Sequence, residues 1–188
     1  MKGLRLQKII FWALCCALGL FCKRLVAPAA NIITNWLHIP GGIGTSFSLM
    51  FLAVAGVLMP HPRCCTIMAA VQSMLALSLG MVGSMGALSP IGYIFPGIVM
   101  DLVFWGAAKA RLSQADALVA ANALGAVCAA LTADLIVFRL WGFGLLLYLC
   151  VAATAGMLFG LLGGRLVKKL RPAIRIYTEK EENVYENI

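Results

Sequence analysis

The stretch from Phe143 to Val167, FGLLLYLCVAATAGMLFGLLGGRLV, carries a single charged side chain, that of Arg165. About 20 consecutive apolar residues are enough for a helix to cross the hydrocarbon core of a bilayer. Similar apolar runs recur along the chain, in which 62% of the residues are hydrophobic and only 12% are charged. A soluble domain has about 25% charged residues. This chain cannot cover its surface with polar groups, so we expect a helical domain whose solvent is lipid.

The sequence predicts an all-α integral membrane domain of six transmembrane helices over residues 1–170 and a polar cytoplasmic tail, expected to be disordered, over residues 171–188. The N-terminal run resembles a signal peptide but lacks a small-residue cleavage site, so we take it as the first span. The second span is short for a full crossing and is expected to begin earlier or to cross at an angle. The six predicted spans are Ile9–Val26, Phe47–Pro60, Cys65–Val82, Tyr93–Ala108, Ala115–Phe138 and Phe143–Val167.

Basic residues predict the orientation of these helices, because cytoplasmic loops are enriched in Lys and Arg. Only Lys23, Arg24 and Arg139 fall on one side of the arrangement, and the remaining basic residues fall on the other. Both termini are therefore predicted to be cytoplasmic. The net charge of +8 follows mostly from this asymmetry, so we expect no nucleic-acid partner.

The longest connection on the predicted outer side is Ala27–Ser46, which carries Asn35, Trp36 and His38. A long connection in a compact membrane protein is often a lid or a binding loop. A second outer segment, GSMGALSPIGY, is rich in turn-forming residues. We interpret it as irregular backbone at the mouth of a pocket, where it faces a solute or protein rather than lipid.

Asp101 lies inside an apolar helix, about 12 Å below Tyr93 at 1.5 Å per residue. A carboxylate at such a depth costs about 2.5–3.5 kcal/mol on insertion scales and needs an internal partner. Asn122, on the antiparallel fifth helix, lies at a similar predicted depth and is the candidate partner. Two interpretations stay open: Asp101 ties the fourth and fifth helices together, or it is a ligand or coupling residue.

Asp134, near the outer end of the fifth helix, also has two interpretations. It forms an interfacial ion pair with Arg139, or it is a pocket acid that recognises a polar or cationic solute. Tyr93, Trp141 and Trp36 are predicted at a similar depth. They are typical of the aromatic belt at a membrane interface, and together they would also form a stacking site for a flat ring.

Small residues form two strips suited to close contact between helices. Ala13 and Ala17 are four residues apart on the first helix, and Gly156, Gly160 and Gly164 repeat this spacing on the sixth.

Other local features have structural interpretations. Ser113 is the expected N-cap of the fifth helix, with Asp116 as an acid in its first turn. Gln72 on the third helix is expected to form an inward hydrogen bond.

No catalytic or metal-binding constellation is evident in the sequence. The seven cysteines form no CxxC pair and lie mostly in apolar runs, where Cys behaves as a small hydrophobe. His38 and His61 are predicted on opposite sides of the membrane and cannot share a metal. There is no P-loop. We expect no enzymatic activity, no cofactor and no ATP hydrolysis by this chain itself.

The chain resembles the substrate-binding S components of energy-coupling factor (ECF) transporters, particularly vitamin-type ones from prokaryotes. The resemblance lies in the six short helices, in Ala13-x-x-x-Ala17 and in the terminal basic run. It is closest in PAANIITNWLHIPGGIGTSFSLMFLAVAGVL and AAVQSMLALSLGMVGSMGALSPIGYIFPGIVMDLV. It covers residues 8–110 well and the rest only through topology.

This resemblance implies a multi-pass protein of a prokaryotic plasma membrane that captures a vitamin or its precursor from outside. The implied partners are a membrane coupling subunit and two ATPase subunits, and Ala13 and Ala17 would form the strip that meets the coupling subunit. The substrate-binding residues implied by position are Asn35, Trp36 and His38 in a lid and Tyr93, Asp101, Asp134 and Trp141 around the pocket.

The sequence leaves the ligand open, because no thiamine or riboflavin signature is evident. Asp134 and the aromatic residues favour a cationic or hydrogen-bonding heterocycle. An alternative function is a self-sufficient small transporter that uses Asp101 as its proton site. It predicts uptake without ATPase partners and loss of uptake when the proton gradient collapses.

Overall fold

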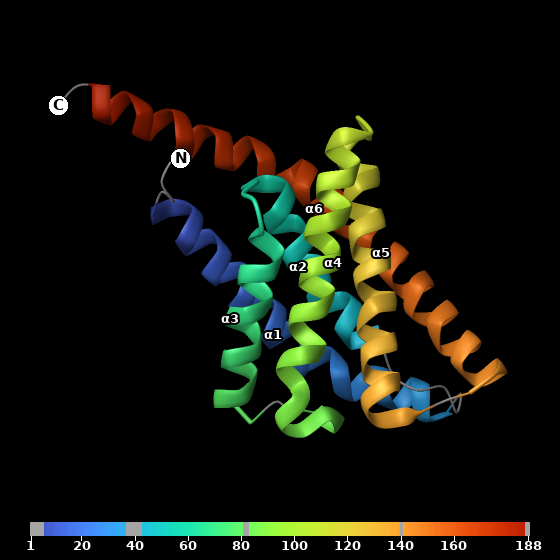
Figure 1. Ribbon diagram of the computed structural model, residues 1–188. Helices are drawn as coiled ribbons and strands as arrows, with labels where there is room; N and C mark the ends of the chain where they lie inside the picture. The colour runs from blue at the N-terminus through green and yellow to red at the C-terminus, as the bar shows by residue number, and fades with distance from the viewer. Residues whose placement is uncertain (1–5, 37–42, 81–82, 140, 187–188) are drawn as a thin grey trace.

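A computed structural model describes residues 6–36, 43–80, 83–139 and 141–186 of the chain (Figure 1). Within these ranges the backbone is helical apart from short turns and contains no strand, which confirms the all-α prediction. The described elements are α1 (Leu6–Trp36), α2 (Ile43–Leu58), α3 (Cys64–Ser78), the 3-10 segment η1 (Gly83–Leu88), α4 (Ser89–Lys109), α5 (Gln114–Ala133), the π-helical turn η2 (Asp134–Phe138) and α6 (Phe143–Glu186).

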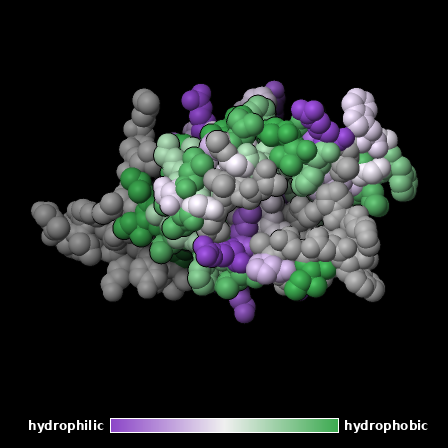
Figure 2. Space-filling model, turned by 90° about the horizontal axis from the view of Figure 1, so that it is seen from below, coloured by the Kyte–Doolittle hydropathy of each residue, from purple (hydrophilic) through white to green (hydrophobic). Residues whose placement is uncertain are grey.

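Four of the described helical segments are long and apolar enough to cross a membrane, namely Lys8–Val26, Ser89–Lys109, Gln114–Phe138 and Phe143–Pro172. The apolar helices α2 and α3 are shorter, with 16 and 15 residues. Seen from below, the described surface is largely hydrophobic and only scattered hydrophilic side chains interrupt it (Figure 2). These features indicate a membrane-spanning protein.

The ends of the helices define two ends of the bundle (Figure 1). The N-terminus of α1, the α2–α3 turn and the α4–α5 turn lie toward the upper end in this view, which we call the turn end. The start of α2, η1, η2 and the start of α6 lie at the lower end, which we call the η end. Which membrane side each end faces stays a prediction.

The prediction of a long loop after the first span was wrong. α1 continues past Val26 to Trp36, and α2 begins at Ile43, so most of Ala27–Ser46 is helical. Pro28 lies inside α1. Proline removes one helical hydrogen bond, but membrane helices tolerate it where other groups satisfy the freed carbonyl.

Three other helix boundaries differ from the prediction or refine it. α2 begins four residues before Phe47, as its short predicted length suggested. The GSMGALSPIGY segment is irregular only in part: η1 contains Gly86 at φ 54° and ψ −132°, and α4 already begins at Ser89. Residues 171–186 of the tail, which was expected to be disordered, are helical, because α6 continues to Glu186.

The N-cap prediction for α5 is confirmed. The Oγ of Ser113 accepts a hydrogen bond of 3.2 Å from the backbone N–H of Asp116, and the Ser113 hydroxyl donates to the Asp116 carboxylate at 2.6 Å. At the same end of the bundle, Arg171 of α6 donates to Gln114 of α5. The start of α5 is therefore fixed both within its own helix and to α6.

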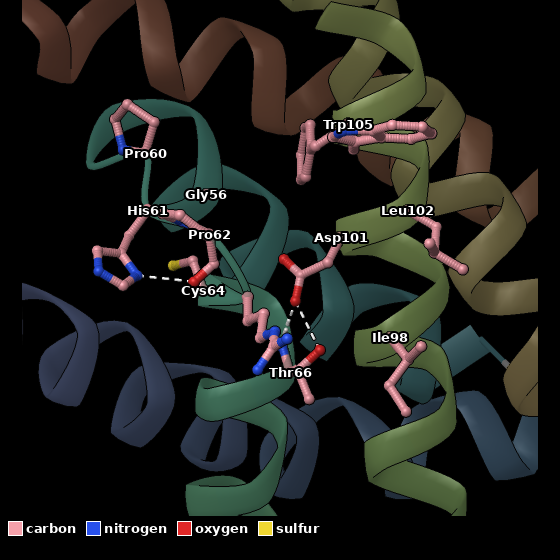
Figure 3. A pocket seen from close by; sticks show the side chains of 12 residues that line it. Gly56, Pro60, His61, Pro62, Cys64, Thr66, Ile98, Asp101, Leu102 and Trp105 are labelled. Carbon is pink, nitrogen blue, oxygen red and sulfur yellow. Dashed lines mark hydrogen bonds between the residues drawn. The ribbon is translucent and has the colours of Figure 1, made fainter. Parts of the chain in front are cut away.

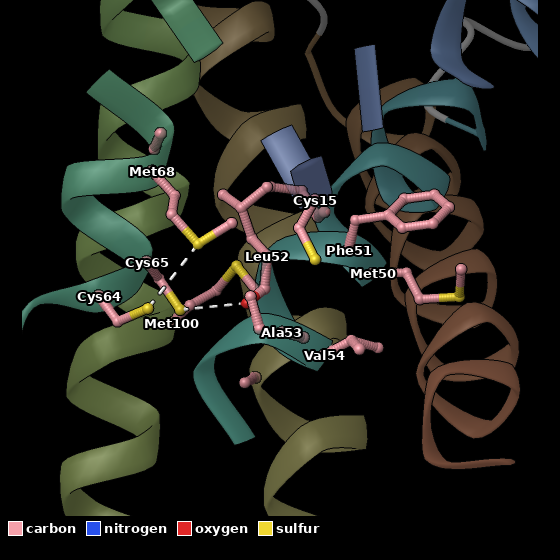
Figure 4. Close-up of a cluster of buried hydrophobic side chains, with 14 of the residues drawn as sticks. Cys15, Met50, Phe51, Leu52, Ala53, Val54, Cys64, Cys65, Met68 and Met100 are labelled. Atoms are coloured by element: carbon pink, nitrogen blue, oxygen red, sulfur yellow. Dashed lines mark hydrogen bonds between the residues drawn. The ribbon is translucent and has the colours of Figure 1, made fainter. Parts of the chain in front are cut away.

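A sulfur-rich core fills the bundle where α1, α2, α3 and α4 meet (Figure 4). Cys16 donates through its thiol to the carbonyl of Met68 at 3.5 Å, and Cys65 donates to the carbonyl of Leu52 at 3.7 Å. Among the described residues no group of His, Cys, Asp or Glu could hold a metal ion. These cysteines act as small core residues, as the sequence indicated.

The glycine strip on α6 contacts α5 closely at two of its three positions. A Cβ at Gly156 would lie 2.7 Å from the Cα of Ala123, and a Cβ at Gly160 would lie 2.8 Å from the Cα of Val119. A Cβ at Gly164 would meet nothing within 4 Å. Close packing was therefore predicted correctly for Gly156 and Gly160 only.

Candidate functional site

Buried polar side chains lie in the middle of the bundle and toward its η end. Ser46 and Ser48 belong to the first turns of α2, Ser89 begins α4, and Asp134 directly follows α5. The middle of the helices contributes the others. The described residues with a buried polar or charged side chain are Ser46, Ser48, Gln72, Ser73, Ser89, Asn122 and Asp134.

Two buried amides form hydrogen bonds between helices at mid-depth, one joining α3 to α1 and the other joining α5 to α2 and α6. Gln72 of α3 donates to the carbonyl of Cys16 on α1 at 3.2 Å, which confirms its inward hydrogen bond. Asn122 of α5 donates to the carbonyl of Gly156 on α6 at 2.8 Å and to that of Ser46 on α2 at 3.4 Å. Gly19 makes room for this layer, because a Cβ there would lie 2.7 Å from the Gln72 amide nitrogen.

Several polar atoms of these side chains have no hydrogen-bond partner in the described structure. They are the Oγ atoms of Ser48 and Ser89 and the Oδ1 of Asn122, all fully buried. Leaving such a group unpaired costs about 1–3 kcal/mol. Buried polar atoms without a protein partner are the positions at which a polar solute or ordered water gains hydrogen bonds.

Tyr93, Asp134 and Trp141 lie in three different environments. The Tyr93 hydroxyl accepts a hydrogen bond of 2.9 Å from Lys23 on α1, whose Nζ lies 4.5 Å from the ring centroid. Asp134 is only 5% exposed, whereas Arg139 is exposed on its surface. Trp141 is 89% exposed.

The structure describes two of the three residues that were predicted to form a lid. Asn35 and Trp36 lie in the last turn of α1, at the η end. His38 lies outside the described residues. The substrate-binding role of these three residues stays a prediction.

Asp101 does not pair with Asn122, so this prediction was wrong. Its carboxylate accepts three hydrogen bonds at the start of α3. One, of 3.0 Å, comes from the Cys65 N–H. The other two come from Thr66, at 2.8 Å from its N–H and 2.6 Å from its hydroxyl (Figure 3). Asp101 thus caps the N-terminus of α3 from the neighbouring helix, where a negative charge is favoured by the helix dipole.

Gly97, one turn before Asp101, allows α4 to approach α3. A Cβ at Gly97 would lie 2.7 Å from the Cβ of Ala69 and 2.9 Å from the carbonyl oxygen of Cys65. The Gly97–Asp101 spacing therefore combines close packing with capping on one face of α4.

A cavity of about 780 Å³ lies beside this cap, toward the turn end of the bundle (Figure 3). The α2–α3 turn forms one wall through Pro60, His61, Pro62 and Arg63, and α4 forms the other. Of the predicted site residues only Asp101 lines it. The sequence analysis missed this cavity, although MPHPRCC combines two prolines, a histidine and an arginine at a turn beside an apolar helix.

Ala13 and Ala17 both lie on the exposed face of α1. Cys16 and Gly19, which flank them in the sequence, are buried and belong to the opposite face. The large exposed neighbours of the two alanines are Leu14, at 64%, and Phe21, at 60%. The role of this strip as a surface for a coupling subunit stays a prediction.

Comparisons of the chain with protein-family models, with curated proteins and with solved structures found no match.

Proposed function

We propose that the chain is the substrate-specificity subunit of an ECF-type ABC importer. It binds a small, water-soluble, ring-containing micronutrient of the vitamin class and delivers it through a coupling subunit driven by two ATPases. The observation that carries the proposal is the asymmetry of the interior. Among the described residues, the core of sulfur, aliphatic and aromatic side chains contains one buried polar atom without a partner, Nε1 of Trp12. Ser48, Ser89 and Asn122, by contrast, leave three such atoms in the middle of the bundle and toward the η end.

This asymmetry suits a cup that opens at one end only. In this proposal a solute enters from the η end, meets these polar groups and stops at the packed core around Leu52 and Met68, which are 0% and 1% exposed; the cavity of about 780 Å³ lies toward the other end. The chain then needs a partner to release the solute on the other side. The exposed Ala13–Ala17 strip supplies a surface for such a partner, because small residues allow close helix contact in lipid.

The proton-coupled alternative has less support from the structure. Asp101 already accepts three hydrogen bonds that hold α3 and α4 together. A proton carrier has to exchange with water during transport, whereas loss of charge from Asp101 would remove a cap. The structural interpretation of Asp101 therefore explains its position without a transport role.

The direct test is to purify the chain from cells grown in rich medium and to identify co-purified small molecules by mass spectrometry. We expect one ring-containing micronutrient in stoichiometric amount. Vesicles that contain the purified chain alone should show no sustained uptake of it. Robust uptake by the chain alone, lost when the proton gradient is collapsed, would overturn the proposal in favour of the alternative.

Two substitutions locate the ligand once it is known. Ser48→Ala removes a buried hydroxyl that has no described partner, so it should weaken binding about tenfold, the equivalent of one hydrogen bond. Ser78→Ala, at an exposed serine bonded to its own helix, is the matched control. Asp134→Asn should weaken a cationic ligand, and unchanged affinity would remove Asp134 from the pocket.

A further inference from the structure

The wall of α4 that lines the cavity near Asp101 changes in character along one helical face. Ile98, Leu102 and Trp105 are 40%, 60% and 67% exposed, and Lys109 follows Trp105 by one turn. The Nζ of Lys109 lies 5.5 Å from the centroid of the Trp105 ring. The spacing of these four residues places them on the same face of the helix. The face therefore passes from aliphatic to aromatic to cationic toward the turn end.

This order matches the cross-section of one leaflet of a bilayer. Aliphatic side chains suit the acyl region, Trp is enriched where the hydrocarbon ends, and Lys near a helix end reaches the headgroups. The Trp105–Lys109 pair therefore places the membrane interface at the last turns of α4.

The opposite wall of the cavity supplies a second cation. Arg63 comes directly before α3, in a left-handed conformation with φ 63° and ψ 26°, and it lines the cavity. Within the described part of the chain its guanidinium forms no hydrogen bond or ion pair. The one carboxylate of the cavity, that of Asp101, is turned toward the start of α3, where three donors hold it.

We propose that this groove between the α2–α3 turn and α4 binds one anionic phospholipid. Its phosphate lies between Arg63 and Lys109, and one acyl chain runs along Trp105, Leu102 and Ile98. Arg63 lines the cavity, and Lys109 lies beside Trp105, which also lines it. These two cations favour an anionic headgroup, and the exposed aliphatic face favours a tethered chain over a free anion. The volume of about 780 Å³ is large enough for a headgroup and part of a chain.

The inference goes beyond the proposed transport function and does not depend on it. The site would tie the α2–α3 turn to α4 through a lipid, next to the cap that already joins α3 and α4. Anionic lipid should therefore stabilise the protein as well as bind to it.

Fluorescence quenching by brominated lipids tests the proposal on the full chain. The chain is placed in phosphatidylcholine vesicles that contain a small fraction of phosphatidylglycerol, with bromine on the acyl chains of one lipid or the other. The signal of Trp105 is the difference between the native chain and Trp105→Phe. We expect brominated phosphatidylglycerol to quench this signal about fivefold more effectively than brominated phosphatidylcholine at equal mole fraction.

Two double variants with equal loss of charge separate a site from general attraction. Arg63→Gln/Lys109→Gln should abolish the preference for phosphatidylglycerol. Arg165→Gln/Lys169→Gln, at exposed positions of α6, should leave it intact. Circular dichroism of each variant checks that it is folded.

Three results would overturn the proposal. One is equal quenching of Trp105 by the two brominated lipids, and another is equal loss of preference in both double variants. The third is full competition by soluble glycerol phosphate at millimolar concentration, which would show recognition of a free anion rather than a lipid. None of these results bears on whether the chain binds a micronutrient.

Discussion

The carboxylate of Asp101 on α4 accepts hydrogen bonds from both the backbone N–H and the hydroxyl of Thr66 on α3, at 2.8 and 2.6 Å. Helix α3 has Arg63 at its N-cap position, and no side-chain hydrogen bond from that residue caps it. The first N–H groups of a helix need acceptors, and in lipid no water supplies them. The carboxylate on α4 thus supplies the missing cap of α3. This contact explains both how the start of α3 is stabilised and why α4 carries an acid.

Asp101→Asn should lower the stability of the protein. The substitution removes the charge and turns an amide nitrogen toward backbone N–H groups that also donate. Hydrogen bonds to charged groups contribute about 1.5–3 kcal/mol each, and for a chain of this size each kcal/mol shifts the Tm by about 2–4 °C. We expect a Tm about 5 °C lower in detergent, measured by circular dichroism.

Asp116→Asn is the control for this loss of charge, because Asp116 is an exposed acid near the start of α5. Its effect on Tm should be clearly smaller. A native Tm for Asp101→Asn, combined with loss of solute uptake, would contradict the capping role and favour Asp101 as a coupling residue.

Gly97→Ala should separate α4 from α3. The added methyl group would lie 2.7 Å from the Cβ of Ala69 and 2.9 Å from the carbonyl oxygen of Cys65, and forced overpacking costs about 1–3 kcal/mol. Gly106→Ala in the same helix is the control, because a Cβ at Gly106 meets nothing within 4 Å. Thermal unfolding of the two variants should give a lower Tm for the first and an unchanged or higher Tm for the second.

A double variant sharpens this comparison. Ala69→Gly removes one of the two close contacts, so Gly97→Ala/Ala69→Gly should recover part of the lost stability. Strict additivity of the two single effects would show that the Gly97 and Ala69 positions do not contact each other.

The helical class and the approximate position of each helix could be predicted from the sequence, because long apolar runs with few charges permit little else. The partner of Asp101 could not be predicted by matching depths, since this method compares side chains only. The true partners are backbone N–H groups of Cys65 and Thr66, which donate to the carboxylate. An uncapped helix start at Arg63 near a buried acid was the signal that could have revealed them.

The end of α1 illustrates a second limit. Pro28 and the polar residues after it are typical of a helix end, yet α1 continues to Trp36. Local propensity is weak against tertiary context. The cavity at the α2–α3 turn was missed for a related reason, because its walls come from residues about 40 positions apart, such as Arg63 and Trp105, and no local pattern joins them.

Gly156→Ala should weaken the contact between α5 and α6, whereas Gly164→Ala should not. At Gly156 the new methyl group would lie 2.7 Å from a backbone atom of Ala123, so one helix has to move. At Gly164 there is open space, and alanine is the better helix former by about 1 kcal/mol. Thermal unfolding in detergent should show a lower Tm for Gly156→Ala and an equal or higher Tm for Gly164→Ala. An equal decrease in Tm for both variants would show that the close contact at Gly156 does not determine the loss of stability.

Replacing Ala13 and Ala17 by leucine tests the partner surface on which the proposed function depends. Both alanines are exposed, so larger side chains there should leave the fold and its Tm nearly unchanged. Two helices in lipid approach closely only where small residues let their backbones meet, so the double variant should no longer co-purify with the coupling subunit and its ATPases while it still binds solute. Thr154→Leu, which enlarges an exposed position of α6, is the control and should assemble normally. Intact assembly of the alanine variant would show that the coupling subunit binds a different face of the chain.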